Sequence, residues 1–115
     1  MKFTFLGTGT SQGVPVITCT CEVCLSSDKK NNRTRTSLMI QSETTTVVID
    51  TGPDFRFQML REQVKDLDAV VFTHGHKDHV AGLDDIRPFN YLLGKTINVY
   101  AEERVQQTLK NEFSY

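Results

Sequence analysis

Alternation of polar and apolar residues predicts β-strands in the first half of the chain. Residues 2–6 alternate and end at a glycine, a pattern typical of a strand that enters a tight turn. Residues 36–41 and 45–49 flank a short polar segment, and together they predict a β-hairpin. The apolar run 67–72 predicts a further strand that is buried on both faces.

Apolar residues three and four positions apart predict a helix over residues 55–64. Its apolar side consists of Phe57, Leu60 and Val64, and Leu67 continues the same spacing just beyond its end. We expect these side chains to face the core of the protein. Asp54 precedes the helix and is expected to cap its N-terminus through its carboxylate.

The last third of the chain continues the alternation of helices and strands. A short apolar stripe over residues 83–89 predicts a helix that Pro88 ends or kinks. Residues 96–101 predict a strand, and residues 102–113 predict a final helix. The apolar side of that helix consists of Val105, Leu109 and Phe113. The pattern as a whole predicts an α/β fold, a sheet flanked by helices.

Length and composition are consistent with one domain over residues 1–115. Charged residues make up 23% of the chain and the formal net charge is −1, so no general attraction to nucleic acid is expected. The N-terminal apolar run is too short for a signal peptide, and no run approaches the length of a membrane span. We therefore expect a cytoplasmic protein with no membrane partner.

The glycine-rich segment 7–13 follows the first predicted strand, as in dinucleotide-binding proteins. Its last glycine, however, comes one position too late for the dinucleotide-binding pattern. Residues 14–17 are β-branched and interrupted by a proline, so no helix follows to bind a pyrophosphate. A tight turn, in which glycine adopts unusual dihedral angles, is the better interpretation.

Three cysteines, Cys19, Cys21 and Cys24, lie within six residues. Their odd number and short spacing argue against a secreted disulfide framework. The same spacing allows three sulfur atoms to converge on one metal ion, although a structural zinc site usually has four ligands. Three free thiols remain the alternative interpretation. The polar segment 26–35 that follows predicts an exposed loop whose basic residues face solvent.

All three histidines of the chain lie between His74 and His79, directly after the buried strand predicted over residues 67–72. If that strand continues, His74, His76 and Asp78 alternate and point to one side. Imidazole and carboxylate groups at this spacing are suited to Zn, Mn or Fe. A polar loop with surface histidines is the alternative, but it does not explain why all of them occur here.

The segment Thr73-His74-Gly75-His76-Lys77-Asp78-His79 matches the His-x-His-x-Asp-His signature of the metallo-β-lactamase superfamily. Further similarity covers residues 5–11, the cysteine trio, residues 49–54 and residues 82–87. Together these segments resemble the branch that contains the phosphoribosyl cyclic phosphate phosphodiesterase, a relative of tRNase Z. The resemblance implies the N-terminal half of a four-layer αββα sandwich, with a mixed sheet and flanking helices.

The resemblance also implies two metal sites in the His motif. In the family pattern, His74 and His76 bind the first divalent ion, and Asp78 and His79 bind the second. Asp78 is also the implied catalytic residue, because its carboxylate both binds metal and accepts a proton. The family completes these sites with two further His and a bridging Asp from the second half of the fold, beyond Tyr115.

Other residues have implied roles around these ions. Asp50 and Thr73 are expected to hold metal-binding His side chains in place without touching the metal. Arg87 is a candidate for contacting a substrate phosphate, although a surface salt bridge explains it equally well. The cysteine trio is completed in the family by a later His, which implies one structural zinc ion.

The implied function is a hydrolase that uses a metal-bridging hydroxide on a small, cyclic phosphodiester, with two Zn or Mn ions as cofactors. A tRNase Z-like nuclease is one alternative, and nucleic acid is the less expected substrate. A non-catalytic metal-binding fragment that needs a missing half or a partner chain is the other. Residues 1–115 alone are expected to be inactive and to self-associate through an exposed sheet face.

Overall fold

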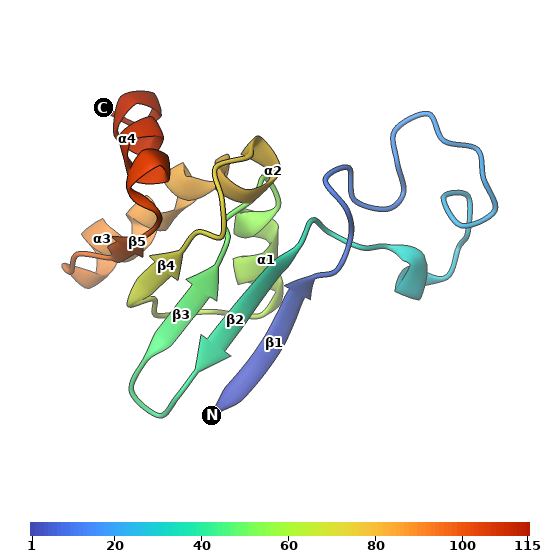
Figure 1. Cartoon of the computed structure of the whole chain (residues 1–115). Coiled ribbons are helices and arrows are strands. Elements are labelled where there is room, and N and C mark those ends of the chain that lie inside the picture. Colours follow the sequence, from blue (N-terminus) through green and yellow to red (C-terminus); the bar gives the residue numbers. More distant parts are fainter.

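The computed structural model describes residues 1–115 and contains one five-stranded mixed sheet in the order β1-β2-β3-β4-β5 (Figure 1). The strands β1, β2 and β3 are antiparallel, whereas β3, β4 and β5 are parallel. The strand bounds are Lys2–Gly7 for β1, Ser37–Gln41 for β2, Thr46–Ile49 for β3, Ala69–Val71 for β4 and Asn98–Tyr100 for β5. The predicted α/β class, the hairpin and the mixed sheet are confirmed.

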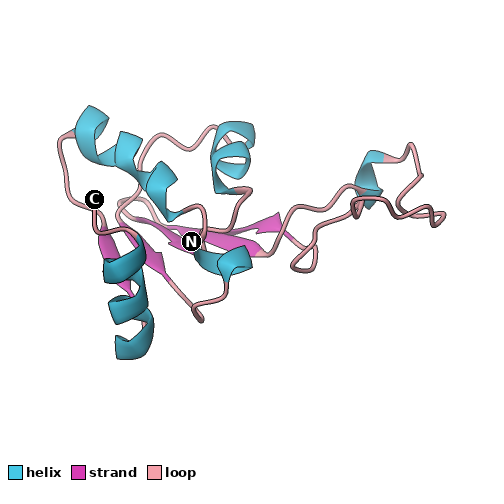
Figure 2. Ribbon diagram, turned by 90° about the horizontal axis from the view of Figure 1, so that it is seen from above, coloured by secondary structure: helices cyan, strands magenta, loops and turns pink.

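The helices complete the body of the domain. Their bounds are Phe55–Arg61 for α1, Lys77–Val80 for α2, Arg87–Leu93 for α3 and Glu103–Glu112 for α4, with 3-10 turns at Lys29–Asn31 and Leu83–Ile86. Helices α1 and α3 lie behind the sheet in Figure 1, and Figure 2 shows helices to either side of the sheet. The segment between β1 and β2 projects far from this body in both views. No helix is long and apolar enough to span a membrane.

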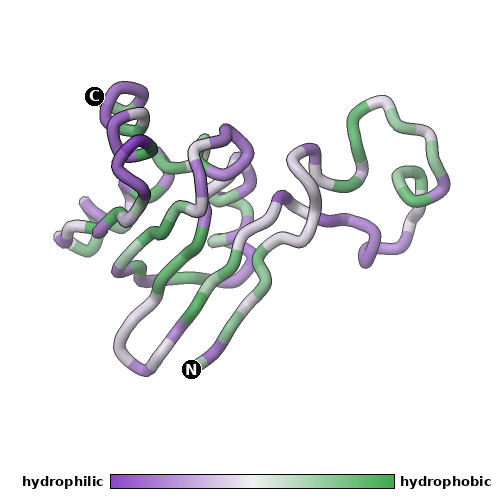
Figure 3. The backbone as a smooth tube through the Cα atoms, viewed as in Figure 1, coloured by the Kyte–Doolittle hydropathy of each residue, from purple (hydrophilic) through white to green (hydrophobic).

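One face of the sheet packs against the helices and forms the core. Val48 of β3 and Val70 of β4 are fully buried, and Met39 of β2 lies beside Val48 in the sheet register. Phe55 of α1 and Leu67 are buried in the same cluster. Figure 3 shows that the central strands are hydrophobic along most of their length, as expected where parallel strands are covered.

The opposite face of the sheet is apolar but only partly covered. One cross-strand row runs from Phe5 through Leu38, Ile49 and Val71 to Tyr100. At its two ends, Phe5 is 73% exposed and Tyr100 is 57% exposed. Figure 1 looks onto this face, and no helix crosses β1, β2 or β3 in front. The exposed sheet face predicted from the sequence is therefore present, and we call this row of residues the open sheet face.

Two of the four core positions predicted for this region, Val64 and Leu67, are confirmed, because both pack in the core. The prediction for the buried side of α1 itself was wrong. Phe57 and Leu60 are 57% and 60% exposed, whereas Phe55, Gln58 and Met59 are buried. The helix is also shorter than predicted, because it ends at Arg61. Gly52 and Gly82 approach each other so closely that a Cβ on Gly82 would contact both Gly52 and Phe55. This close approach places Phe55, at the first position of the helix, inside the core and sets the orientation of the helix.

Asp54 does not cap α1, contrary to the prediction, since its side chain makes no hydrogen bond to the helix N-terminus. Its carboxylate instead accepts hydrogen bonds from the backbone N–H of Arg35 at 2.9 Å and from Arg35 Nη1 at 3.2 Å. A charge-assisted pair with a guanidinium is stronger than a single cap bond, so the distant partner is favoured. Asp54 thereby ties α1 to the segment that enters β2.

Pro88 lies in the first turn of α3 instead of ending the preceding turn. The 3-10 turn Leu83–Ile86 leads directly into α3, and Pro88 occupies its first turn, where the missing N–H costs nothing. The predicted apolar stripe is confirmed, because Leu83, Ile86 and Phe89 pack against the core. The final helix is confirmed as well: Val105 and Leu109 of α4 are buried and Phe113 packs against them.

Candidate metal centres

The His motif spans the link from β4 to α2. Strand β4 ends at Val71, and His76 is still extended, with φ of −68° and ψ of 148°. Helix α2 then begins at Lys77, so Asp78 and His79 are consecutive helical residues. The predicted alternation of His74, His76 and Asp78 therefore ends at His76. The main chain turns after His76, where the backbone N–H of His79 donates to His76 O at 2.9 Å and closes the first turn of α2.

The three imidazole rings and Asp78 lie together despite this change of geometry. The ring centroid of His74 lies 4.6 Å from that of His76 and 4.0 Å from that of His79. His79 Nε2 lies 3.1 Å from Asp78 Oδ2. The carboxyl ends of the parallel strands β3 and β4 position this cluster, which we call the His cluster.

Asp50 anchors the His cluster through hydrogen bonds to Thr73 and His79. It follows β3, is 3% exposed, and adopts a left-handed φ of 63°, which Asp tolerates better than most residues. Its Oδ1 accepts a hydrogen bond from the Thr73 backbone N–H at 2.8 Å. Its Oδ2 accepts from Thr73 Oγ1 at 2.7 Å and from His79 Nδ1 at 2.7 Å. One buried carboxylate thus holds both the strand end and an imidazole.

These contacts assign the tautomers of two imidazoles. A carboxylate only accepts, so His79 Nδ1 carries the hydrogen that it donates to Asp50. The Thr73 hydroxyl donates its only hydrogen to Asp50 and can only accept from His74. His74 Nδ1 therefore donates to Thr73 Oγ1 at 2.9 Å. In both rings the neutral form then has its lone pair on Nε2, the atom available to bind a metal.

The donor set of the His cluster fits divalent metals such as Zn and Mn, which bind imidazole and carboxylate. The ligand atoms of the four side chains do not all lie within 4.8 Å of one another, unlike those of the cysteine trio.

A cavity of about 310 Å³ lies beside the His cluster. His74 and His76 line one side, and Glu102 and Arg104 from the start of α4 line the other. Sequence reasoning missed Glu102 and Arg104, because no local spacing links them to the His motif. The signal available was topological: they follow β5, and the carboxyl ends of the parallel strands β4 and β5 meet at one edge.

Arg87 lies outside this cavity. It begins α3, and its Nη1 lies 3.6 Å from Asp84 Oδ1 in an exposed pair. It lines a separate cavity together with Tyr115. The structure thus gives Arg87 the surface salt bridge that was the alternative interpretation, and does not bring it to the His cluster.

The three cysteines form the second candidate centre. Their sulfur atoms all lie within 4.8 Å of one another, and no disulfide links them. The Cys24 N–H donates to Cys21 Sγ at 3.4 Å, and the Val16 N–H donates to Cys24 Sγ at 3.3 Å. Such N–H contacts to sulfur suit thiolates that bind a metal ion, and three thiolates fit Zn with one position left for another ligand.

The local environment changes the acidity of two of these thiols. The backbone N–H of Cys24, with help from the Cys19 and Cys24 side chains, lowers the pKa of Cys21 to about 7. The Val16 N–H acts to lower the pKa of Cys24, but the Cys19 and Cys21 sulfurs and desolvation together raise it. Shared protons and mutual repulsion explain why neighbouring thiols shift in opposite directions.

Comparison with known proteins agrees with this fold. Residues 45–115 match the family described as Beta-lactamase superfamily domain. An octanoyltransferase of Porphyromonas gingivalis (strain ATCC BAA-308 / W83) is 44% identical over 116 residues, which cover 100% of this chain and 23% of that protein.

Two solved structures are similar over nearly the whole chain. A new diphosphatase from the PhnP family has a TM-score of 0.93 and 50% identity, covering 98% of this chain and 46% of the other. Zn(2+)-bound PqqB from Methylobacterium extorquens has a TM-score of 0.81 and 25% identity, covering 96% of this chain and 40% of the other. The chain therefore spans less than half the length of the relatives named here. It belongs to the β-lactamase superfamily, and its fold is the metallo-β-lactamase fold that the His motif predicted.

Proposed function

We propose that the protein containing this chain is a metal-dependent phosphodiesterase that acts on a small, cyclic phosphodiester. The observation that carries the proposal is the pair of imidazoles, His74 and His79. Thr73 and Asp50 hold their Nδ1 atoms, which leaves Nε2 available in both rings, and Asp78 lies beside Nε2 of His79. The similarity to a diphosphatase of the PhnP family supports a phosphate substrate over other ester classes.

Two divalent ions, Zn or Mn, would be held by His74 with His76 and by Asp78 with His79, and would supply charge stabilisation and an activated water. The remaining ligands would come from residues outside this chain. Asp50 and Thr73 keep the imidazole rings in one orientation, so that little reorganisation is needed during the reaction.

Asp78 and Arg104 have the clearest roles toward a substrate. The Asp78 carboxylate lies beside His79 and is partly exposed, so it accepts a proton from the attacking water. Arg104 lines the cavity at the His cluster and forms no salt bridge within the chain, so its guanidinium is free to contact a phosphate oxygen.

The test compares hydrolysis of a chromogenic phosphodiester, a cyclic nucleotide, a diphosphate and a pre-tRNA by the full-length protein with added Zn or Mn. We expect the small phosphodiesters to be hydrolysed and His76→Ala to lose turnover together with bound metal. Arg87→Ala is the matched control and should retain both. Turnover confined to pre-tRNA would favour the nuclease, and turnover that is unchanged in His76→Ala would refute the assigned site.

We also propose one structural zinc ion at Cys19, Cys21 and Cys24, which requires reduced thiols and hence a reducing compartment such as the cytoplasm. Elemental analysis should show zinc that is lost in Cys19→Ser while the metal of the His cluster is retained. A stable disulfide between Cys19 and Cys24 in cytosolic material would contradict this proposal.

A non-catalytic, metal-binding role for residues 1–115 alone is the second candidate. Each ion would have two protein ligands here, and catalytic sites usually supply three. The open sheet face, with Phe5 73% and Tyr100 57% exposed, would also lack a covering layer and would promote self-association. Light scattering and phosphodiester turnover of 1–115 should show oligomers without activity, whereas an active monomer would exclude this candidate.

A further inference from the structure

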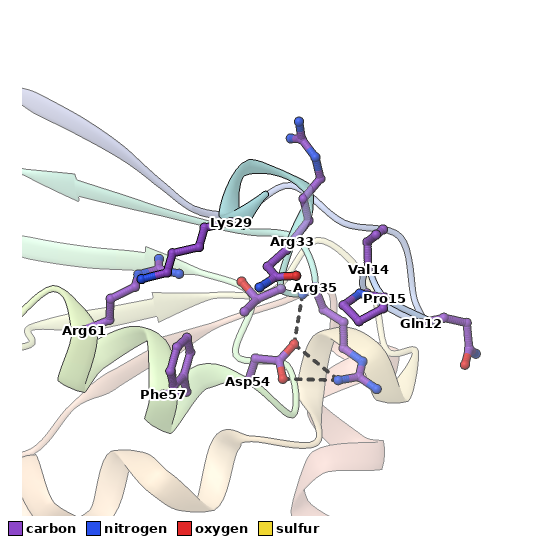
Figure 4. A pocket seen from close by; sticks show the side chains of 12 residues that line it. Gln12, Val14, Pro15, Lys29, Arg33, Arg35, Asp54, Phe57 and Arg61 are labelled. Carbon is purple, nitrogen blue, oxygen red and sulfur yellow. Dashed lines mark hydrogen bonds and ion pairs between the residues drawn. The ribbon is translucent and has the colours of Figure 1, made fainter. Parts of the chain in front are cut away.

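A second cavity, of about 590 Å³, lies between α1 and the segment that joins β1 to β2 (Figure 4). Its lining shares no residue with the cavity at His74 and His76. Four cationic side chains line it, and Asp54 is the only carboxylate among the lining residues. The cationic residues are Lys29, Arg33, Arg35 and Arg61. Such an excess is unexpected in a chain whose formal net charge is −1.

Asp54 does not compensate this charge, because Arg35 already neutralises it. Arg35 Nη1 lies 3.2 Å from both carboxylate oxygens of Asp54, and its Nε donates to the Ser11 carbonyl at 2.9 Å. Lys29 and Arg33 form no salt bridge. The ion pair of Arg35 with Asp54 therefore forms a wall of the cavity. The positive charges of Lys29 and Arg33 remain without a carboxylate partner.

Lys29 and Arg61 come from distant parts of the chain, yet their side chains extend toward each other in Figure 4. The Arg61 guanidinium is held in place: Nη2 donates to the Leu6 carbonyl at 2.6 Å and Nε to Glu62 at 2.9 Å. These bonds leave its Nη1 without a partner. Glu62 compensates part of the Arg61 charge, whereas Lys29 has no carboxylate partner, so an anion between the two side chains would be attracted to both. The side-chain amide of Asn32 also belongs to the lining and supplies a neutral donor.

Phe57 adds an apolar surface beside these cations. It is 57% exposed, and Arg61 Cζ lies 5.7 Å from its ring centroid. A large exposed aromatic ring beside cationic side chains suits a ligand with a phosphate and a planar ring, because stacking on an aromatic face is favourable for any base.

We propose that this cavity binds the phosphate group of a small phosphorylated ligand, with Lys29, Arg61 and Asn32 as donors and Phe57 as the surface for an attached ring. The site shares no residue with the His cluster and does not depend on metal bound there. Its donor residues are exposed, so its affinity falls as salt concentration rises. Inorganic phosphate and a nucleoside monophosphate share the recognised group, and Phe57 would favour the nucleotide.

The test measures binding of inorganic phosphate and of adenosine 5′-monophosphate by calorimetry, using the full-length protein. The protein carries His76→Ala, so that phosphate has no metal ion of the His cluster to bind, and no chelator is added, because the cysteine trio lies in the segment that carries Lys29 and Asn32. We expect saturable binding of the nucleotide that Lys29→Glu weakens at least about 10-fold, because a charge-assisted donor is replaced by a repelling charge. Lys30→Glu is the matched control: Lys30 is adjacent and exposed, does not line this cavity, and should leave binding unchanged.

Arg61 needs a second check because it also bonds the Leu6 carbonyl. Arg61→Lys keeps the charge and should weaken binding less than Arg61→Gln, with circular dichroism confirming that both variants fold. Absence of binding, or equal loss in Lys29→Glu and Lys30→Glu, would overturn the site. Equal affinity for phosphate and nucleotide, unaffected by Phe57→Ala, would overturn the role assigned to Phe57.

Discussion

The His cluster and the cysteine trio are both candidate metal centres, but the fold supports them in different ways. The His cluster lies where β3 and β4 end, and the buried Asp50 anchors it through Thr73 and His79. The cysteines lie in the projecting segment between β1 and β2, and Cys21 is exposed. The domain core therefore positions the His cluster, whereas metal binding by the cysteine trio orders the loop that carries the three cysteines.

The largest expected effect breaks the packing beneath the His cluster. In Gly52→Ala the new Cβ would collide with the carbonyl oxygen of Asp78, so α2 must move or the protein must unfold. We expect a loss of about 3 kcal/mol or more in the free energy of unfolding, because the clash involves backbone atoms. Denaturant titration measures it. Gly75→Ala is the control, since its Cβ would meet Val105 at an ordinary 3.6 Å; equal losses would contradict the close packing described.

The next effect removes the anchor itself. Asp50→Ala leaves the Thr73 N–H and His79 Nδ1 without their acceptor in a partly buried position, which should cost about 2 kcal/mol of stability. It should also weaken metal binding about 10-fold or more, because the imidazoles lose their fixed orientation.

Asp50→Asn keeps the shape of the side chain and tolerates the left-handed backbone, so it should cost less stability than Asp50→Ala. Metal titration and denaturant titration of both variants separate orientation from folding. If Asp50→Ala bound metal with native affinity, the anchoring contacts would have no role in the His cluster.

A smaller effect is expected from the cysteine trio. Cys21→Ser should remove one equivalent of zinc and make the segment 14–35 more susceptible to proteolysis, because its sulfur atoms no longer share an ion. The sheet should keep its stability, since none of the three cysteines is in the core. Limited proteolysis with mass spectrometry provides the readout. Loss of metal from the His cluster in this variant would show that the two centres are coupled.

The smallest effect tests how β4, which leads into the His motif, is anchored at its start. Asp68 accepts hydrogen bonds from Lys95 Nζ at 2.8 Å and from the Thr46 N–H at 2.7 Å, and these contacts lower the pKa of its carboxyl. Stabilisation by a lowered carboxyl pKa is complete above about pH 4 and is lost as pH falls through the folded-state value.

Asp68→Asn should therefore lower Tm slightly at pH 7 and should no longer differ from the unsubstituted protein at strongly acidic pH. Thermal melts between pH 2 and pH 7 would show this convergence. A difference that grew toward low pH would reverse the sign expected for a carboxylate paired with Lys95.

Sequence patterns predicted the bounds of most helices and strands within two residues, and the wrong predictions share a cause. The hairpin strands and α4 were predicted well because each buries one face with a regular period, as with Val105 and Leu109. Helix α1 has only seven residues, too few for periodicity to decide between the sets 55/58/59 and 57/60. Tertiary contacts decided instead, and Gln58 is buried because its amide bonds Thr34 and Arg35.

The sequence by itself determined the superfamily, the mixed sheet and the two clusters of candidate ligands, because each cluster lies within six consecutive residues and its chemistry is local. Only the tertiary structure decided which residues share a cavity. Glu102 and Arg104 share a cavity with His74 and His76 through the adjacent ends of β4 and β5, and Lys29 and Arg61 line one cavity beside α1. These contacts join segments far apart in the chain, and no local period of hydrophobic or charged residues encodes such pairings.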